Sequence, residues 1–265
     1  MNGLSLVQAL QPAHWPTLVV VSARIVGLML AAPLWSMANV PRSFRGAMVI
    51  VFTLVVLPTV EPSRLPPDYL GFLLPLASEL VLGLAIGLIG AVFLAGINLA
   101  GEVAALQMGL NLGPALSPMA DASVTGVGEL KNLLAVCIYV TLGGHVVLLT
   151  GIAESFRSVP PGAAVDMGQG GRAVAALAGT MFSVAIRAAA PITVALLLAN
   201  IGMAILSRAV PQLNAMAVAF PVTIGLGFLM LGAALPYTGA FIGQWAGGLH
   251  GSVAQMIGAF TPGAR

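Results

Sequence analysis

Long uncharged stretches dominate the pattern of hydrophobic and polar positions along this chain. Between Arg187 and Arg265 the only formal charge is Arg208, which follows 20 uncharged residues (188–207) and precedes 56 more (209–264). Twenty residues of α-helix are about 30 Å long, which is the thickness of the hydrocarbon core of a bilayer. The pattern therefore predicts two membrane-length helices joined by a polar turn at Arg208.

Four further apolar stretches precede this pair, so we expect about six long apolar helices in all. They are expected at about residues 16–41, 46–60, 69–100, 132–153, 173–207 and 212–249. The last of these is long enough for one span followed by a second, partial helix. Segments of this length and apolarity are typical of membrane helices, so we predict an all-α integral membrane protein.

Polar and proline-rich segments separate the expected helices. Residues 61–68 contain three prolines and cannot continue a helix. Residues 111–131 and 154–172 are rich in Gly, Pro, Ser and Asp, so both are expected to be loops. We expect a single helical membrane domain, with N-terminal helices in 1–110, a loop at 111–131, central helices in 132–207 and a hairpin arm with a tail in 208–265.

The composition agrees with a membrane protein and excludes several other classes. Charged residues make up 7% of the chain, against about 25% in soluble domains, and hydrophobic residues make up 59%. The ten basic residues are dispersed, so nucleic-acid binding is not expected. The three histidines have no metal-ligand spacing and no nucleophile motif is present, so we expect no enzyme, metal or cofactor.

Five polar side chains lie in or beside apolar segments and need a partner. They are Arg24, Glu79, Glu102, His145 and Arg187. A charge at the centre of a bilayer costs about 2.5–3.5 kcal/mol on insertion scales, so each is expected to make a buried polar contact. One interpretation is a transporter with Arg–Glu pairs along a path, and the other is a subunit whose charges are buried against sibling subunits. Composition alone does not separate the two.

Glycines recur at helical spacing in two places. Gly83 and Gly87 form a GxxxG pair, and a second set of four recurs every fourth residue at Gly239, Gly243, Gly247 and Gly251. Such strips allow helix backbones to approach closely, which is a main source of association between helices in lipid. We predict helix packing at both sets, the alternative being the general enrichment of Gly in membrane helices.

Three blocks of sequence carry a resemblance to a known family. The first reads Gly-Glu-Val-Ala-Ala-Leu-Gln-Met-Gly at residues 101–109. The second reads Gly-His-Val-Val-Leu-Leu at 144–149 and is followed by Phe156 and Pro160. The third runs from Ala190-Pro191 through Arg-Ala-Val-Pro-Gln-Leu-Asn at 208–214 to Phe220-Pro221. In this order, over roughly residues 15–250, the blocks resemble the FliR family of flagellar export-gate proteins.

The resemblance implies a pore-forming subunit of the type III protein export gate in the bacterial inner membrane, at the flagellar basal body. It implies assembly with FliP and FliQ homologues, contact with FlhA and FlhB homologues, and passage of unfolded export substrates. It also implies a FliP-like unit joined to a FliQ-like unit, built of helical hairpins packed against sibling subunits.

The resemblance further assigns two sets of residues. The residues that would form a pore plug or gate loop are Gln107, Met108, Gly109, Asn111, Gly113, Pro114, Pro118 and Met119. Those of the hairpin signature are Arg208, Pro211, Gln212, Asn214 and Pro221. Two alternatives stay open: the T-type subunit of a virulence injectisome, and a secondary transporter, which would be expected to show inverted repeats.

We predict that Glu102, Arg187 and Arg208 make intersubunit or interhelix contacts and take no part in proton chemistry, because no segment carries clustered carboxylates. Replacing Glu102 by Gln should then weaken assembly and export together, as measured by co-purification of the gate and by secretion of its substrates. A Glu102→Gln variant that assembles normally but exports nothing would contradict an assembly role.

Overall fold

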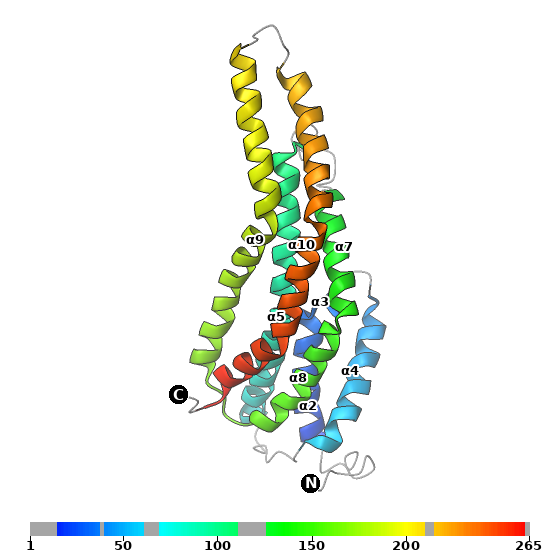
Figure 1. Cartoon of the computed structure of the whole chain (residues 1–265). Helices are drawn as coiled ribbons and strands as arrows, with labels where there is room; N and C mark the ends of the chain where they lie inside the picture. The colour runs from blue at the N-terminus through cyan, green and yellow to red at the C-terminus, as the bar shows by residue number, and fades with distance from the viewer. Residues whose placement is uncertain (1–14, 38–39, 61–68, 111–125, 210–214, 263–265) are drawn as a thin grey trace. The chain divides into compact units, whose positions relative to one another are not determined.

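The computed structural model describes residues 15–37, 40–60, 69–110, 126–209 and 215–262, and all regular structure in these ranges is helical (Figure 1). The elements are α2 (Trp15–Ala31), α3 (Pro33–Ser36), α4 (Arg42–Val56), η2 (Leu57–Thr59), α5 (Tyr69–Gln107), α7 (Gly126–Thr141), α8 (Gly144–Ser158), α9 (Met167–Ala209) and α10 (Ala215–Phe260). The prediction of an all-α membrane protein is confirmed.

The number of membrane-length helices is smaller than the six expected. Four helices of the described ranges are long and apolar enough to cross a bilayer, or five if α7 and α8 form one bent span. The first stretch falls short because α2 has only 17 residues and ends just before Pro33. The stretch at 132–153 is divided between α7 and α8, which meet at an angle of 57° beside Gly143, a residue with φ of 72°.

Three expected boundaries were also wrong. Residues 154–172 are not one loop, because α8 runs to Ser158 and α9 starts at Met167. Residues 126–131 belong to α7, whereas 111–125 and the link at 61–68 lie outside the described residues. The C-terminal stretch forms one helix of 46 residues in place of a span and a partial helix. That helix accommodates Pro221 and Pro236 in its interior, as membrane helices can.

The chain divides into two compact units, which are described separately. Unit 1 contains residues 1–92, 143–179 and 246–265, and unit 2 contains residues 93–142 and 180–245. The helices α5, α9 and α10 each contribute one part to each unit.

In unit 1, α2 lies against the first part of α5 with almost no side chain between the backbones. A Cβ atom built on Gly27 would lie 2.8 Å from the backbone nitrogen of Leu84, and one built on Gly83 would lie 2.8 Å from the carbonyl carbon of Arg24. A Cβ on Gly87 would lie 2.9 Å from three atoms of α2 and the residue after it. The GxxxG pair therefore sits where two helix backbones meet, with Gly27 opposite it.

The other helices of unit 1 pack through glycines as well. Gly151 of α8 faces Val253 of α10, and Gly170 of α9 faces the ring of Phe260. The backbone N–H of Asp166 donates to the carbonyl of Phe260 at 3.0 Å, which joins the start of α9 to the end of α10. These contacts fix the turn between α8 and α9 inside unit 1.

Unit 2 has an apolar core made by α5, α9 and α10. The buried members are Ala104, Ala105, Met108, Ile192, Leu196, Leu231 and Ala234. Beside them an aromatic group includes Phe93 stacked on Trp245, with ring centroids 3.7 Å apart, and Tyr139 of α7 at 6.3 Å from Trp245. Ring contacts thus link α7 to α10 and α10 to α5.

We predict that Gly83→Ala destabilises the protein by about 1–3 kcal/mol, because the added methyl group must push two helix backbones apart. Unfolding by denaturant of the purified protein in detergent measures the change. Gly46→Ala on α4 is the matched control, since a Cβ there meets no atom within 4 Å. Equal unfolding midpoints for the two variants would contradict the close approach of α2 and α5.

Candidate functional site

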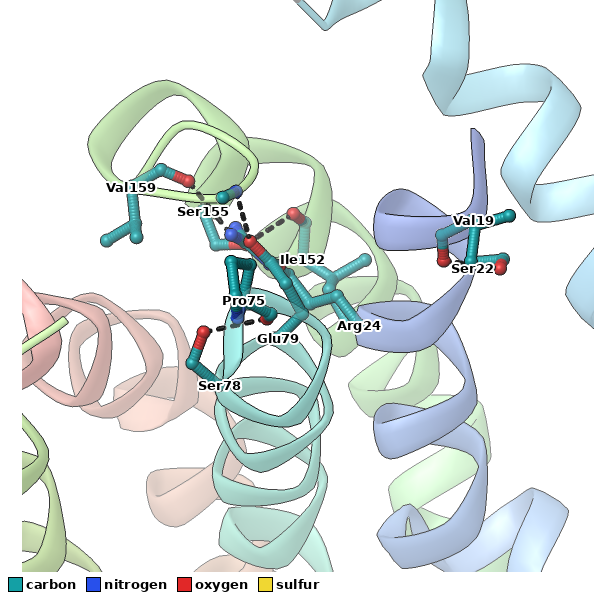
Figure 2. A network of polar contacts seen from close by, with 10 residues as sticks. Val19, Ser22, Arg24, Pro75, Ser78, Glu79, Ile152, Ser155 and Val159 are labelled. Atoms are coloured by element: carbon teal, nitrogen blue, oxygen red, sulfur yellow. Dashed lines mark hydrogen bonds and ion pairs between the residues drawn. The ribbon is translucent and has the colours of Figure 1, made fainter. Parts of the chain in front are cut away.

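A buried ion pair between α2 and α5 is the centre of the polar structure of unit 1 (Figure 2). The Nε atom of Arg24 donates to Oε2 of Glu79 at 2.5 Å, and the two side chains are 0% and 2% exposed. Arg24 lies on the same face of α2 as Val20, Val21 and Leu28, so it is a charged residue within an otherwise apolar stripe. The charge is therefore enclosed by protein within this chain.

The other nitrogen and oxygen atoms of the two charged groups form hydrogen bonds with α8 and with the turn after it. Nη1 of Arg24 donates to Oγ of Ser155 at 2.9 Å, and Nη2 donates to the carbonyl of Val159 at 2.9 Å. On the other side, the backbone N–H of Gly162 donates to Oε1 of Glu79 at 3.0 Å. We call Arg24, Glu79, Ser155, Val159 and Gly162 the Arg24 network.

An aromatic ring completes the surroundings of the guanidinium. The Cζ atom of Arg24 lies 4.1 Å from the centroid of the Phe156 ring, a distance at which the ring face attracts a cation. Two helices (α2 and α5), α8 and the α8–α9 turn therefore meet at one charge. A buried ion pair of this kind stabilises a fold only when its other hydrogen-bonding groups are also satisfied, as they are here.

The other polar side chains expected to be buried do not join this network. Glu102 is half-buried and has no ion-pair partner among the described residues. His145 lies in the first turn of α8, and its Nδ1 atom is buried without a hydrogen bond to any described residue. Arg187 is exposed on α9. Of the five, the structure brings together Arg24 and Glu79.

The Gln107-Met108-Gly109 block forms the end of α5. Gly109 has φ of 77°, its N–H donates to the carbonyl of Leu106, and the N–H of Leu110 donates to the carbonyl of Ala105 at 3.0 Å. These two bonds define a Schellman cap, in which glycine is favoured because it adopts a positive φ without strain. Leu110 packs against the apolar core of unit 2, and a hydrophobic contact of this residue frequently accompanies such caps.

The rest of the predicted gate loop and most of the hairpin turn lie outside the described residues. This applies to Asn111, Gly113, Pro114, Pro118 and Met119 of the gate loop, and to Pro211, Gln212 and Asn214 of the turn. Arg208 is exposed in the last turn of α9, and Pro221 is exposed within α10. A polar end to α9 at Arg208 agrees with the predicted position of the turn.

The four-glycine strip on α10 has open space beside it. A Cβ atom built on Gly239, Gly243, Gly247 or Gly251 would meet no described atom within 4 Å. The strip therefore differs from Gly83 and Gly87, which face another helix of the same chain. Helix packing on this strip stays a prediction, and it would involve a helix of another molecule.

Two features of unit 2 escaped the sequence reasoning. Lys131 is only 3% exposed, and its Nζ atom donates to the carbonyl of Ala188 at 3.4 Å. It was placed at the edge of an expected loop, and the only signal against that was the apolar run beginning directly after it. The aromatic group of Phe93, Tyr139 and Trp245 was also missed, because these residues are far apart in the sequence and have no common motif.

The His, Cys, Asp and Glu side chains of the described ranges are scattered. Within these ranges, no three His, Cys, Asp or Glu side chains come together in a way that could hold a metal ion. The polar groups that do converge, in the Arg24 network, bind one another. The arrangement fits a class of helical membrane proteins in which charge serves to join helices.

The chain belongs to the family described as bacterial export proteins, family 1, whose model matches residues 15–247. It is 28% identical over 235 residues to flagellar biosynthetic protein FliR of Pectobacterium carotovorum subsp. carotovorum, covering 89% of this chain and 88% of that protein. It is 26% identical to the protein of that name from Escherichia coli (strain K12), covering 86% and 85%. With the one from Bacillus subtilis (strain 168) it shares 29% identity, covering 82% and 85%. The resemblance drawn from the sequence blocks is confirmed.

We predict that Arg24→Met destabilises the protein by about 3–5 kcal/mol, because it leaves the Glu79 carboxylate buried without a counter-charge. Denaturant unfolding in detergent measures this loss. The double variant Arg24→Met/Glu79→Met should recover part of it, since no uncompensated charge remains.

The exchanged pair Arg24→Glu/Glu79→Arg distinguishes an oriented network from a simple ion pair. In the native protein the Val159 carbonyl accepts a hydrogen bond from the side chain at position 24, and the Gly162 N–H donates one to the side chain at position 79. The exchange places an acceptor beside the carbonyl and a donor beside the N–H. The exchanged variant should therefore remain unstable, and native stability in it would contradict the network.

Proposed function

We propose that this chain is a pore-forming core subunit of the flagellar type III protein export gate in the bacterial inner membrane. The family match over residues 15–247 is the observation that carries the proposal. The three relatives reported above are all flagellar by name, which favours the flagellar system over an injectisome. In this role the chain passes unfolded flagellar subunits across the membrane.

The lengths of α9 and α10 support an assembled subunit. With 43 and 46 residues and a rise of 1.5 Å per residue, they measure about 65 and 69 Å along their axes. The hydrocarbon core of a bilayer is about 30 Å thick, so lipid covers only part of such helices. Apolar side chains beyond that thickness need a protein partner.

The low burial of α9 and α10 within this chain also supports an assembled subunit. In their most apolar stretches only 17% of α9 and 22% of α10 is buried within the chain, against 61% of α5. Large side chains such as Leu198 and Leu229 are 64% and 61% exposed. Homologues of FliP and FliQ are the partners proposed to cover these faces, and FlhA and FlhB homologues are proposed to contact the assembly from the cytoplasm.

The Arg24 network favours an assembly subunit over a secondary transporter. An Arg–Glu pair on a proton or substrate path needs access to water, whereas Arg24 and Glu79 are 0% and 2% exposed and are bonded on all sides to their own chain. Their charge is used to hold helices together.

The segment 111–125 is proposed to close the pore. Its first ten residues, 111–120, carry no formal charge and are interrupted by Pro114 and Pro118, and Asp121 follows them. An uncharged segment such as residues 111–120 blocks ions without presenting a fixed charge to them, and a passing polypeptide can displace it. The capped end of α5 at Gly109 is the point from which it leaves the helix.

We predict that deleting residues 113–119 makes the assembled gate leaky to small ions. The measurement is ion conductance of vesicles that contain the gate, with co-purification of FliP and FliQ homologues as the check on assembly. The matched control replaces the same seven residues by a Gly/Ser sequence of equal length, which retains the connection but removes the apolar side chains. Unchanged conductance in a gate that assembles normally would contradict the proposal.

A further inference from the structure

The length of helix α4 in unit 1 matches the thickness of a bilayer. From Arg42 at the start of α4 to Thr59 at the end of η2, the 18 residues measure about 27 Å along the helix axis, against about 30 Å for the hydrocarbon core. Only 17% of this stretch is buried within the chain, and Phe44, Val51 and Val55 are 50%, 51% and 66% exposed. A bilayer can therefore cover α4 completely, whereas it covers only part of α9 and α10.

Both charged residues of α4 lie at its start. Arg42 is the first residue of the helix and Arg45 is the fourth, so the two are neighbours on one face. Side chains on a helix point back toward its N-terminus, which directs Arg45 toward the residues that precede α4. There its Nη2 atom donates to the carbonyl of Met37, the residue that follows α3, at 2.6 Å. Both positive charges therefore lie at this end of α4.

Neither arginine of α4 has a counter-charge in the part of the chain that the structure describes. No carboxylate of these residues lies within ion-pair distance of either guanidinium group. Arg42 is exposed, and the Nε atom of Arg45 is buried without a hydrogen-bond acceptor among the described residues. Like charges three or four residues apart on a helix repel each other. The Arg24 network contains its own carboxylate, whereas the start of α4 needs an anion from another molecule.

We propose that the start of α4 binds the phosphate group of an anionic phospholipid, and that the acyl chains of this lipid lie along the exposed side chains of α4. A guanidinium group can donate two parallel hydrogen bonds to a phosphate, so two adjacent arginines suit such a headgroup. Lipid phosphates lie just outside the hydrocarbon core, where a helix of this length ends. One lipid molecule thus supplies both the anion and the apolar surface that α4 lacks. The binding does not depend on the proposed export function.

The lipid contact is tested by quenching of a bimane label on Gly46→Cys in a Cys137→Ser background. Gly46 is exposed one turn after Arg42, and a Cβ atom there meets no atom within 4 Å. The chain is purified with the subunits bound to it and placed in vesicles of equal parts phosphatidylglycerol and phosphatidylcholine, with bromine on the acyl chains of one lipid or the other. We expect brominated phosphatidylglycerol to quench the label several-fold more than brominated phosphatidylcholine, because only the former carries a net negative charge.

Variants of the two arginines connect the lipid preference to the proposed site. The double variant Arg42→Gln/Arg45→Gln should make the two brominated lipids quench equally. The single variant Arg42→Gln should reduce the preference in part, and it removes no ion pair of the described chain whose loss could unfold the protein. The matched control Arg157→Gln/Arg172→Gln removes two exposed arginines from α8 and α9 elsewhere in unit 1, and it should retain the preference.

Three results would overturn the proposal. Equal quenching by the two lipids in the protein with both arginines would overturn binding of the headgroup, and so would a preference that survives in the Arg42→Gln/Arg45→Gln variant. Absence of quenching by either lipid would mean that another protein covers α4, which would overturn the lipid contact. Failure of the proposed export function is recognised separately, by the lack of an ion leak after deletion of residues 113–119.

Discussion

The ion pair of Arg24 with Glu79 is the interaction on which unit 1 depends. It is placed where the backbones of α2 and α5 approach most closely, since the carbonyl group of Arg24 itself faces Gly83. The glycines permit the approach and the charges determine its register, because the guanidinium must meet Glu79, Ser155 and Val159 at the same time. The charge of Arg24 would be costly in lipid, but here it joins α2, α5, α8 and the α8–α9 turn.

Several features of the fold could be predicted from the sequence because they depend on local properties. The uncharged runs predict helices, and the polar residues at Arg208 mark the end of α9. The GxxxG spacing of Gly83 and Gly87 predicts a packing face, although it cannot say that α2 is the helix that covers it. Arg24 and Glu79 were expected to need partners, but they are 55 residues apart and nothing local to either identifies the other.

The wrong predictions arose because a sequence pattern reports only local properties. Counting apolar runs gave six helices, because a run does not reveal a bend such as the one at Gly143, nor a helix as short as α2. The polar residues 154–158 were assigned to a loop, yet the helix continues until the two prolines at 160 and 161. Lys131 was overlooked because its acceptor is a backbone carbonyl near Pro191 on another helix, which no side-chain pattern indicates.

The long helices α9 and α10 connect the physical account to the biological role, because their apolar faces extend beyond what a bilayer covers. The central claim is that sibling subunits cover these faces in the assembled gate. Photo-crosslinking amino acids placed at Leu198 and Leu229 in living cells test it most directly. The account predicts crosslinks from both positions to FliP or FliQ homologues, and adducts to lipid alone at both positions would contradict it.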